Sequence, residues 1–270
     1  MKKYVAVFIL LFFISCHNDS TNNTTVEDVS NPAPPTLSFQ MIKEYPHNPT
    51  YFTEGLIWHN NALYESTGEE GESRLIKTDL NTGKEEQKVD LPAGDFGEGI
   101  AIIGDTLYQL TYRNNKAYAY DVKTFKKLKE FSFLHEGWGM TTDGKELIMS
   151  IGGGSNLYFV DPQTFKVKNI LSVSDNYGPV NSINELEYVN GAVFANVWHE
   201  KKLIKINLQT GKVEGVINIG DILAQAGKRI DESREDKSES VLNGIAFDSA
   251  KNSFYITGKR WPSIFEIRLN

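Results

Sequence analysis

A short phrase returns four times along this chain, and its spacing restricts the fold more than any other feature of the sequence. The phrase begins with Asp or Asn, carries Thr at its fourth position and ends in Gly-Lys or Phe-Lys, at residues 79–84, 121–126, 161–166 and 207–212. Its threonines lie 42, 40 and 46 residues apart. A period of roughly 40 to 50 residues is typical of propellers and solenoids, in which no unit can bury its apolar face alone. We therefore expect a repeat protein whose function lies where the repeats differ.

Each repeat can be divided into four short strands with alternating apolar residues, joined by tight turns at Gly-Asp, Asn-Gly or Asp-Gly pairs. The second repeat shows this division best, with strands at about 99–103, 107–112, 116–122 and 127–133. The corresponding third strands are expected at 74–80, 116–122, 156–162, 202–208 and 263–269. Five third strands predict an all-β fold, a five-bladed β-propeller of four-stranded antiparallel blades.

The last repeat has no room for a fourth strand, because the chain stops at Asn270. Its third strand would then present an unpaired edge. A strand-like segment at 37–44 precedes the first repeat. We predict that this segment closes the ring as the outer strand of the last blade, so that both ends of the propeller meet there. The alternative is a separate N-terminal hairpin.

Residues 1–15 have the layout of a signal peptide, since Lys2 and Lys3 precede an apolar run too short to span a bilayer. Ser15 and Cys16 follow, and residues 13–16 are similar to a bacterial lipoprotein box with Phe13 in place of Leu. We predict that Cys16 is lipidated. Ordinary secretion and a leftover buried thiol are the alternatives.

Residues 16–36 are then the lipidated cysteine and a disordered tether rich in Asn, Ser, Thr and Pro, and residues 37–270 form the catalytic propeller. Cys16 is the single cysteine, so the mature chain has neither a disulfide nor a thiol nucleophile. The net charge of −7 excludes a basic surface for nucleic acid. We expect an exported monomer that is anchored to the bacterial envelope, on its periplasmic or cell-surface side, by lipid alone.

Aligning the repeats shows two positions at which they differ. The start of the first, innermost strand carries Glu54, Glu98, Trp138, Asn184 and Asn243. The end of the second strand carries Gly68, Tyr112, Gly152, Trp198 and Lys259. Because ring closure brings equivalent positions together, we predict that carboxylates, carboxamides, an ammonium group and aromatic rings meet near the axis.

Glu98 is the candidate proton carrier of this group. A carboxyl group in a partly dry, aromatic pocket has a raised pKa and can move protons near neutral pH. Gly97 and Gly99 flank it, and we expect them to let a ligand approach the backbone. The alternative is that Glu98 forms an ion pair with Lys259 and only plugs the channel.

The neighbouring positions supply complementary chemistry. Asn184 and Lys259 offer hydrogen-bond donors that could stabilise an oxyanion on a carbonyl substrate. Trp138, Trp198 and Tyr112 offer flat walls for a small group. Each aromatic residue by itself is more often part of a core.

Other motifs are uninformative. The five histidines show no metal-ligand spacing, so no zinc site is indicated. The glycines at 152–154 lack the Lys-Ser/Thr of a phosphate loop and are interpreted as a blade turn. The charged run at 231–239 is interpreted as a solvated loop, and there is no Gly-x-Ser-x-Gly elbow.

Six phrases in order resemble the plant and bacterial glutaminyl-peptide cyclotransferases, and they touch every blade: residues 52–56, 96–99, 137–144, 184–188, 195–198, and 241–246 with 257–262. The resemblance implies a five-bladed propeller that converts the N-terminal glutamine of peptides or proteins to pyroglutamate with loss of ammonia. It also implies that catalysis needs no zinc or other cofactor, although a structural calcium ion in the channel remains open.

The resemblance assigns roles residue by residue. Glu98 matches the catalytic carboxylate, and Asn184 and Lys259 match its polar partners. The implied substrate-binding residues are Phe52, Glu54, Phe96, Tyr112, Trp138, Trp198 and Asn243. Two of these depart from the family, which more often has Gln at position 54 and Trp at position 112. The added charge of Glu54 could raise the pKa of Glu98 or hold the substrate's ammonium group.

Two further functions remain open from the sequence. The chain could be a non-enzymatic surface propeller that binds peptides or glycans. It could also be a propeller hydrolase dependent on calcium, with oxygen ligands from Glu54, Glu98, Asn184 and Asn243.

Overall fold

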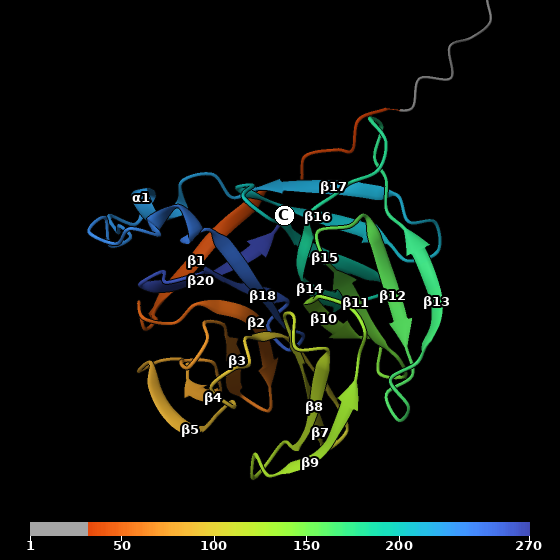
Figure 1. Ribbon diagram of the computed structural model, residues 1–270. Helices are drawn as coiled ribbons and strands as arrows, with labels where there is room; N and C mark the ends of the chain where they lie inside the picture. The colour runs from red at the N-terminus through yellow and green to blue at the C-terminus, as the bar shows by residue number, and fades with distance from the viewer. Residues whose placement is uncertain (1–31) are drawn as a thin grey trace, which may run out of the picture. The chain divides into compact units, whose positions relative to one another are not determined.

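The computed structural model describes residues 32–270, which form five four-stranded antiparallel sheets around a common axis (Figure 1). The predicted all-β, five-bladed propeller is confirmed. The predictions for the signal peptide, for Cys16 and for most of the tether lie outside the described residues. No helix within residues 32–270 is long and apolar enough to cross a membrane.

Four blades follow one another along the chain, each with its innermost strand first. Blade 1 comprises β2 (Thr53–His59), β3 (Ala62–Thr67), β4 (Arg74–Asp79) and β5 (Lys84–Asp90). Blade 2 comprises β6 (Gly97–Ile103), β7 (Thr106–Thr111), β8 (Lys116–Asp121) and β9 (Lys127–Ser132). Blade 3 comprises β10 (Gly137–Thr142), β11 (Leu147–Ile151), β12 (Asn156–Val160) and β13 (Val167–Ser172). Blade 4 comprises β14 (Ile183–Val189), β15 (Ala192–Val197), β16 (Lys202–Asn207) and β17 (Val213–Asn218).

Blade 5 closes the ring with strands from both ends of the described chain. Its inner strands are β18 (Leu242–Asp248), β19 (Ser253–Gly258) and β20 (Ser263–Leu269), and its outer strand is β1 (Phe39–Pro46). β1 runs antiparallel to β20, from Phe39 opposite Leu269 to Pro46 opposite Ser263, so an orange and a dark blue ribbon lie side by side in Figure 1. Closure by an N-terminal strand is thus confirmed, and the separate hairpin is wrong.

β1 begins two residues later than predicted because Leu37 pairs elsewhere. Its amide donates to the carbonyl oxygen of Val216 at 2.8 Å, beside an isolated bridge from Thr36 to the same residue. The segment before β1 therefore lies along the outer strand of blade 4. The N-terminal segment thus contacts blade 4 first and then, as β1, joins the sheet of blade 5.

The recurring phrase forms the outer turn between the third and fourth strands. In blade 1 the amide and hydroxyl of Thr82 donate to Asp79 Oδ1 at 2.8 and 2.6 Å. Phe125 takes the left-handed conformation that Gly83 takes in the first phrase, with φ values of 55° and 68°. A side chain there costs about 1–2 kcal/mol, which burial of Phe125 against Tyr64 of blade 1 offsets. The phrase is structural.

Glu185 of β14 joins three innermost strands at the axis. Its carboxylate accepts the amide of Ile245 in blade 5 at 2.8 Å and that of Leu56 in blade 1 at 3.3 Å. Burial raises the pKa of Glu185 well above the ordinary 4.5, and the charge of Glu187 raises it further. A side chain, not an open channel, therefore occupies the axis beside Asn184.

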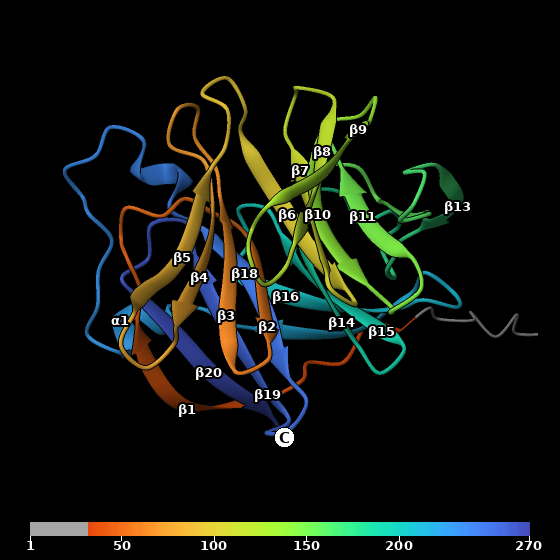
Figure 2. The same ribbon diagram turned by 90° about the horizontal axis from the view of Figure 1, so that it is seen from below.

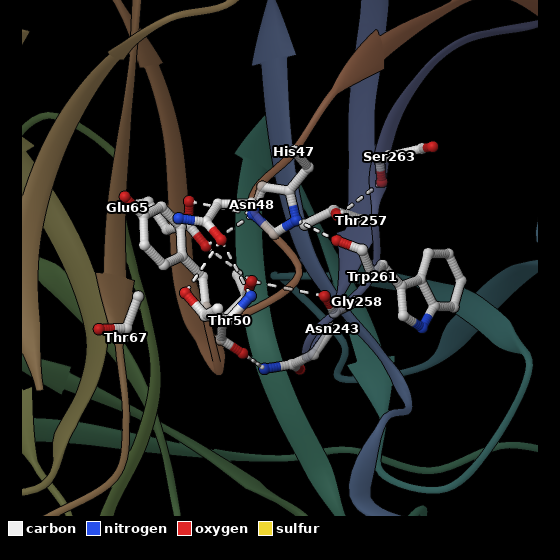
Figure 3. Close-up of polar contacts among 12 residues, drawn as sticks. His47, Asn48, Thr50, Glu65, Thr67, Asn243, Thr257, Gly258, Trp261 and Ser263 are labelled. Carbon is white, nitrogen blue, oxygen red and sulfur yellow. Dashed lines mark hydrogen bonds and ion pairs between the residues drawn. The ribbon is translucent and has the colours of Figure 1, made fainter. Parts of the chain in front are cut away.

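A second buried network fastens the closing strand to blades 1 and 5 (Figure 3). His47, just after β1, lies with Nδ1 2.6 Å from the carbonyl oxygen of Trp261 and Nε2 3.0 Å from Glu65 Oε1. Thr53 also donates to Glu65, at 2.7 Å. Burial opposes protonation of His47, but the charge of Glu65 and the hydrogen bonds to Glu65 and to the Trp261 carbonyl together raise the pKa of the imidazole. Both ring nitrogens thus face acceptors.

Candidate active site

The ring places the predicted positions as the repeat alignment requires. The second residue of each innermost strand is, in blade order, Glu54, Glu98, Trp138, Asn184 and Asn243. The residue directly after each second strand is Gly68, Tyr112, Gly152, Trp198 and Lys259. The end of the propeller at which the innermost strands begin is at the top of Figure 2. Five innermost strands therefore present their first side chains to one end of the axis.

A β-bulge aims these side chains. In every blade the register between the first and second strands shifts at this position, for example between Gly97 and Ile100 in blade 2. The same irregularity occurs in the other four blades. A bulge bends its strand and re-aims a side chain. The alternating pattern of the sequence gives no sign of this extra residue.

A cavity of about 150 Å³ lies at this end of the axis. Its walls include nine of the ten predicted site residues, together with one residue that sequence analysis missed: Phe52, Glu54, Phe96, Glu98, Tyr112, Trp138, Asn184, Trp198, Lys259, and the unpredicted Glu239. The predicted catalytic and aromatic residues are thus brought together in one pocket.

Asn243 is the predicted site residue that does not line the pocket. It is fully buried behind Glu54, and its Nδ2 donates to Glu54 Oε2 at 3.1 Å and to the carbonyl oxygen of Thr53 at 2.8 Å. Its assignment as a substrate-binding residue is therefore corrected. Asn243 orients the carboxylate of Glu54.

Glu54, not Glu98, is the ion-pair partner of Lys259. Lys259 Nζ lies 2.8 Å from Glu54 Oε1, and both side chains are buried. Burial raises the pKa of Glu54 to about 7, although the charge of Lys259 acts in the opposite direction. The ammonium also lies 4.6 Å from the centre of the Phe52 ring. The alternative in which Glu98 pairs with Lys259 is wrong.

Glu98 lines the cavity with its carboxyl group unpaired. Only 4% of the residue is exposed, and no hydrogen bond from residues 32–270 stabilises its charged form. Burial raises its pKa well above the ordinary 4.5, and the negative charge of Glu54 raises it further. The suggested effect of Glu54 on Glu98 is thus present. A buried carboxyl group with a raised pKa is suited to proton transfer.

Asn184 contributes a second unpaired group. It is 4% exposed, and its Oδ1 is buried with no hydrogen-bond partner among the described residues. A buried amide oxygen without a partner costs about 1–3 kcal/mol. Because its side chain lines the cavity, a ligand with a polar group can satisfy it.

Aromatic rings make up most of the wall. Trp138 and Trp198 meet edge to face at 5.6 Å, and Phe96 contacts both Phe52, at 5.9 Å, and Tyr112, at 5.6 Å. Burial raises the pKa of Tyr112 to about 12, which keeps its hydroxyl neutral. Trp198 is 36% exposed and forms part of the mouth.

The glycines beside Glu98 serve the packing of blades, which corrects the expectation that they admit a ligand. A Cβ on Gly99 would lie 2.3 Å from the amide nitrogen of Met140 in blade 3. A Cβ on Gly97 would lie 2.7 Å from the carbonyl oxygen of Thr67 in blade 1. Neighbouring blades can approach this closely only because the side chains are absent.

The charged run at 231–239 does more than the predicted solvated loop. It belongs to an insertion between blades 4 and 5 that contains α1 (Ile222–Gln225) and a 3₁₀ turn (Lys237–Glu239). Asp236 Oδ2 lies 2.7 Å from buried Arg260, which also pairs with Glu69, and Glu239 reaches the pocket. The place of this insertion in the sequence indicates that it can reach the pocket, because it leads directly into the innermost strand β18.

The fold and the pocket together define a class of protein, a five-bladed propeller with a pocket at one end of its axis that is lined by aromatic rings and buried carboxyl groups. The family model described as glutamine cyclotransferase matches residues 10–269, and this chain belongs to that family.

Two relatives agree with this assignment. The chain is 36% identical to glutaminyl-peptide cyclotransferase of Arabidopsis thaliana over 266 residues, which is 97% of this chain and 79% of the relative. Its fold matches the crystal structure of glutaminyl cyclase from Myxococcus xanthus with a TM-score of 0.79 and 33% identity. That match covers 88% of this chain and 98% of the other.

The blade contact beside Glu98 can be tested with alanine. Gly99→Ala places its Cβ against backbone of blade 3, which cannot yield as a flexible side chain would, so we expect a loss of about 1–3 kcal/mol in the free energy of unfolding. Gly94→Ala is the matched control, since no atom lies within 4 Å of its Cβ position. Urea denaturation measures both. Equal stabilities would contradict this account of the glycine.

Proposed function

We propose that this chain cyclises the N-terminal glutamine of peptides and proteins, with Glu98 as the proton carrier. The observation that carries the assignment of roles is the buried, unpaired carboxyl group of Glu98 beside the amide of Asn184 and the ammonium of Lys259. Membership in the glutamine cyclotransferase family supports the reaction itself.

The reaction forms one bond and breaks another. The neutral α-amine of the substrate attacks the carbonyl carbon of its own side-chain amide, and a tetrahedral intermediate results. Glu98 accepts a proton from the attacking nitrogen and delivers it to the side-chain nitrogen, which leaves as ammonia. The ring closure is intramolecular, so the protein mainly holds a folded conformer of the substrate.

The remaining polar groups have distinct tasks in this scheme. Lys259 and Asn184 donate hydrogen bonds to the substrate oxygen as it gains negative charge. Glu54 holds Lys259 in place at 2.8 Å, and Asn243 in turn holds Glu54. Trp138, Trp198 and the other rings exclude water, which strengthens each of these interactions.

Replacement of the proton carrier tests this scheme. Glu98→Gln keeps the shape of the side chain but cannot accept a proton, so we expect ammonia release from a glutamine-initiated peptide to fall by about 10²-fold or more. Circular dichroism should match the wild type and thermal stability should not fall, because no hydrogen bond within residues 32–270 depends on this carboxylate and folding disfavours its charged form. A Glu98→Gln protein with near-normal turnover would end the assignment.

The same assay separates the alternatives. A propeller that only binds peptides or glycans would release no ammonia, and a hydrolase dependent on calcium would lose activity with a chelator. The donor set disfavours calcium, since the ammonium of Lys259 already lies 2.8 Å from a carboxylate oxygen of Glu54. Within residues 32–270 no three His, Cys, Asp or Glu side chains gather in a way that could hold a metal ion. We propose a reaction that proceeds unchanged with chelator.

Glu54→Gln tests the electrostatic link between the two carboxyl groups. The change removes a negative charge that raises the pKa of Glu98 and leaves the opposing charge of Lys259 unpaired. Both effects lower the pKa of Glu98. Because the ionised form accepts the proton, the acidic limb of kcat/KM should move to lower pH, by roughly one unit.

The exposed Glu130→Gln serves as the control and should leave the pH profile unchanged. An acidic limb that stays in place or moves to higher pH in Glu54→Gln would show that Glu54 does not act on Glu98.

We also propose that the protein is exported and held in the bacterial envelope by a lipid on Cys16. The basic start, the short apolar run and Ser15-Cys16 support this. Cys16→Ser should move the protein from the membrane fraction to the soluble fraction, as fractionation of expressing cells would detect. Membrane association that survives the change would exclude this anchor.

A further inference from the structure

A groove of about 370 Å³ lies beside the catalytic pocket, and it has no task in the reaction described above. Apolar side chains supplied by the insertion and by blade 5 make up much of its lining: Leu223, Ala224, Ile230, Val241, Leu242 and Trp261. We propose, on the basis of the proposed function, that this groove binds an apolar side chain at the second or third residue of the substrate peptide.

The groove and the pocket share a wall. Three stretches of chain line the pocket with one residue and the groove with a residue next to it or two further on: Trp198 and His199, Glu239 and Ser240, Lys259 and Trp261. Successive residues of an extended peptide are about 3.3 Å apart. A peptide whose first residue occupies the pocket therefore reaches the groove within its next residues.

The top of this wall is accessible. His199 Nε2 lies 3.6 Å from Glu239 Oε1, and their side chains are 44% and 38% exposed. Trp198, which precedes His199, is also part of the open mouth. The substrate backbone can thus leave the pocket over the His199–Glu239 contact and enter the groove without displacing a buried side chain.

The insertion that forms the far side is firmly attached. Ile222 of α1 is 1% exposed and packs in one cluster with Leu242 and Trp261. At the other end of the insertion, Asp236 is held by buried Arg260 at 2.7 Å. Ala224 is exposed on the same helix and lines the groove. The groove is therefore a preformed site, which limits the ordering cost of binding.

The chemistry of the lining selects an apolar group. The charged residues at the rim are largely paired, Lys201 with Asp221 and Lys228 with Glu44. The indole nitrogen of Trp261 already donates to the carbonyl oxygen of Ser240 at 3.1 Å. Arg229 also lines the groove, and it has no ion-pair partner within residues 32–270. The rest of the lining that is free for a ligand is largely apolar, and burial of a leucine side chain there corresponds to roughly a tenfold or greater gain in binding.

The cavity on the other side of Phe52 offers different chemistry. It is lined mainly by polar and charged groups, among them Thr50, Glu69, Glu72 and Arg74. It lacks the apolar floor of the groove, so an apolar side chain gains little there. A peptide that followed this cavity instead of the groove would therefore favour polar residues, not apolar ones, after its glutamine.

Substrate series and a filled groove test the proposal. For the full-length protein, kcat/KM is measured with glutamine amide, Gln-Ala-Ala-amide, Gln-Leu-Ala-amide and Gln-Ala-Leu-amide. The wild type should prefer one leucine peptide over the alanine peptide by roughly tenfold. Ala224→Trp should abolish this preference and leave glutamine amide unaffected. Gln225→Trp, on the same short helix but outside the groove lining, is the matched control and should keep the preference.

Each outcome decides the proposal. No leucine preference in the wild type, equal loss with all substrates in Ala224→Trp, or equal effects of the two tryptophan variants would overturn it. If Ala224→Trp fails to fold by circular dichroism, Leu223→Ala replaces it and should reduce the leucine preference selectively. Absence of ammonia from every substrate, glutamine amide included, would instead refute the proposed function on which the groove assignment rests.

Discussion

The pairing of β1 with β20 is the interaction on which the rest of the structure depends. It gives the last blade its outer strand and thereby brings blade 5 against blade 1. The ion pair between Glu54 and Lys259 and the hydrogen bond from Asn243 to Glu54 cross this junction. The most polar part of the pocket is therefore assembled from the two blades that the closing strand unites. His47, which follows that strand, contacts both blades through Trp261 and Glu65.

The pKa values in the pocket also depend on which of its two carboxyl groups pairs with Lys259. Lys259 is committed to Glu54, which leaves Glu98 buried without a partner. A lysine shared between the two carboxylates would favour the charged form of both and lower the pKa of Glu98. Asn243, which is buried behind Glu54, donates a hydrogen bond to that carboxylate and thereby holds it toward Lys259. A residue outside the cavity thus shapes the proton affinity inside it.

Period and alignment predicted the blade number, the closing strand and seven of the ten pocket positions, because equivalent residues of a closed ring must converge. The family resemblance added Phe52 and Phe96. Three features could not be predicted, since each depends on contacts between distant segments. The choice of Glu54 as the partner of Lys259 is set by side-chain geometry across the blade junction. The role of Gly99 is set by the backbone of blade 3. The reach of Glu239 into the pocket depends on Asp236 meeting Arg260, which follows in sequence only after two strands.

Ring closure also fixes the order in which the molecule can mature. β1 is the first strand of the propeller to be synthesised, yet its partner residues in β20 are among the last of the chain, with Phe39 opposite Leu269. Contacts this distant in sequence form slowly. Lys259 likewise comes from the final part of the chain. Until it is synthesised, Glu54 lacks its ion-pair partner, and Glu54 and Glu98 are two carboxyl groups without a nearby ammonium group. The pocket of this cyclotransferase is therefore complete only when the last part of the chain is in place.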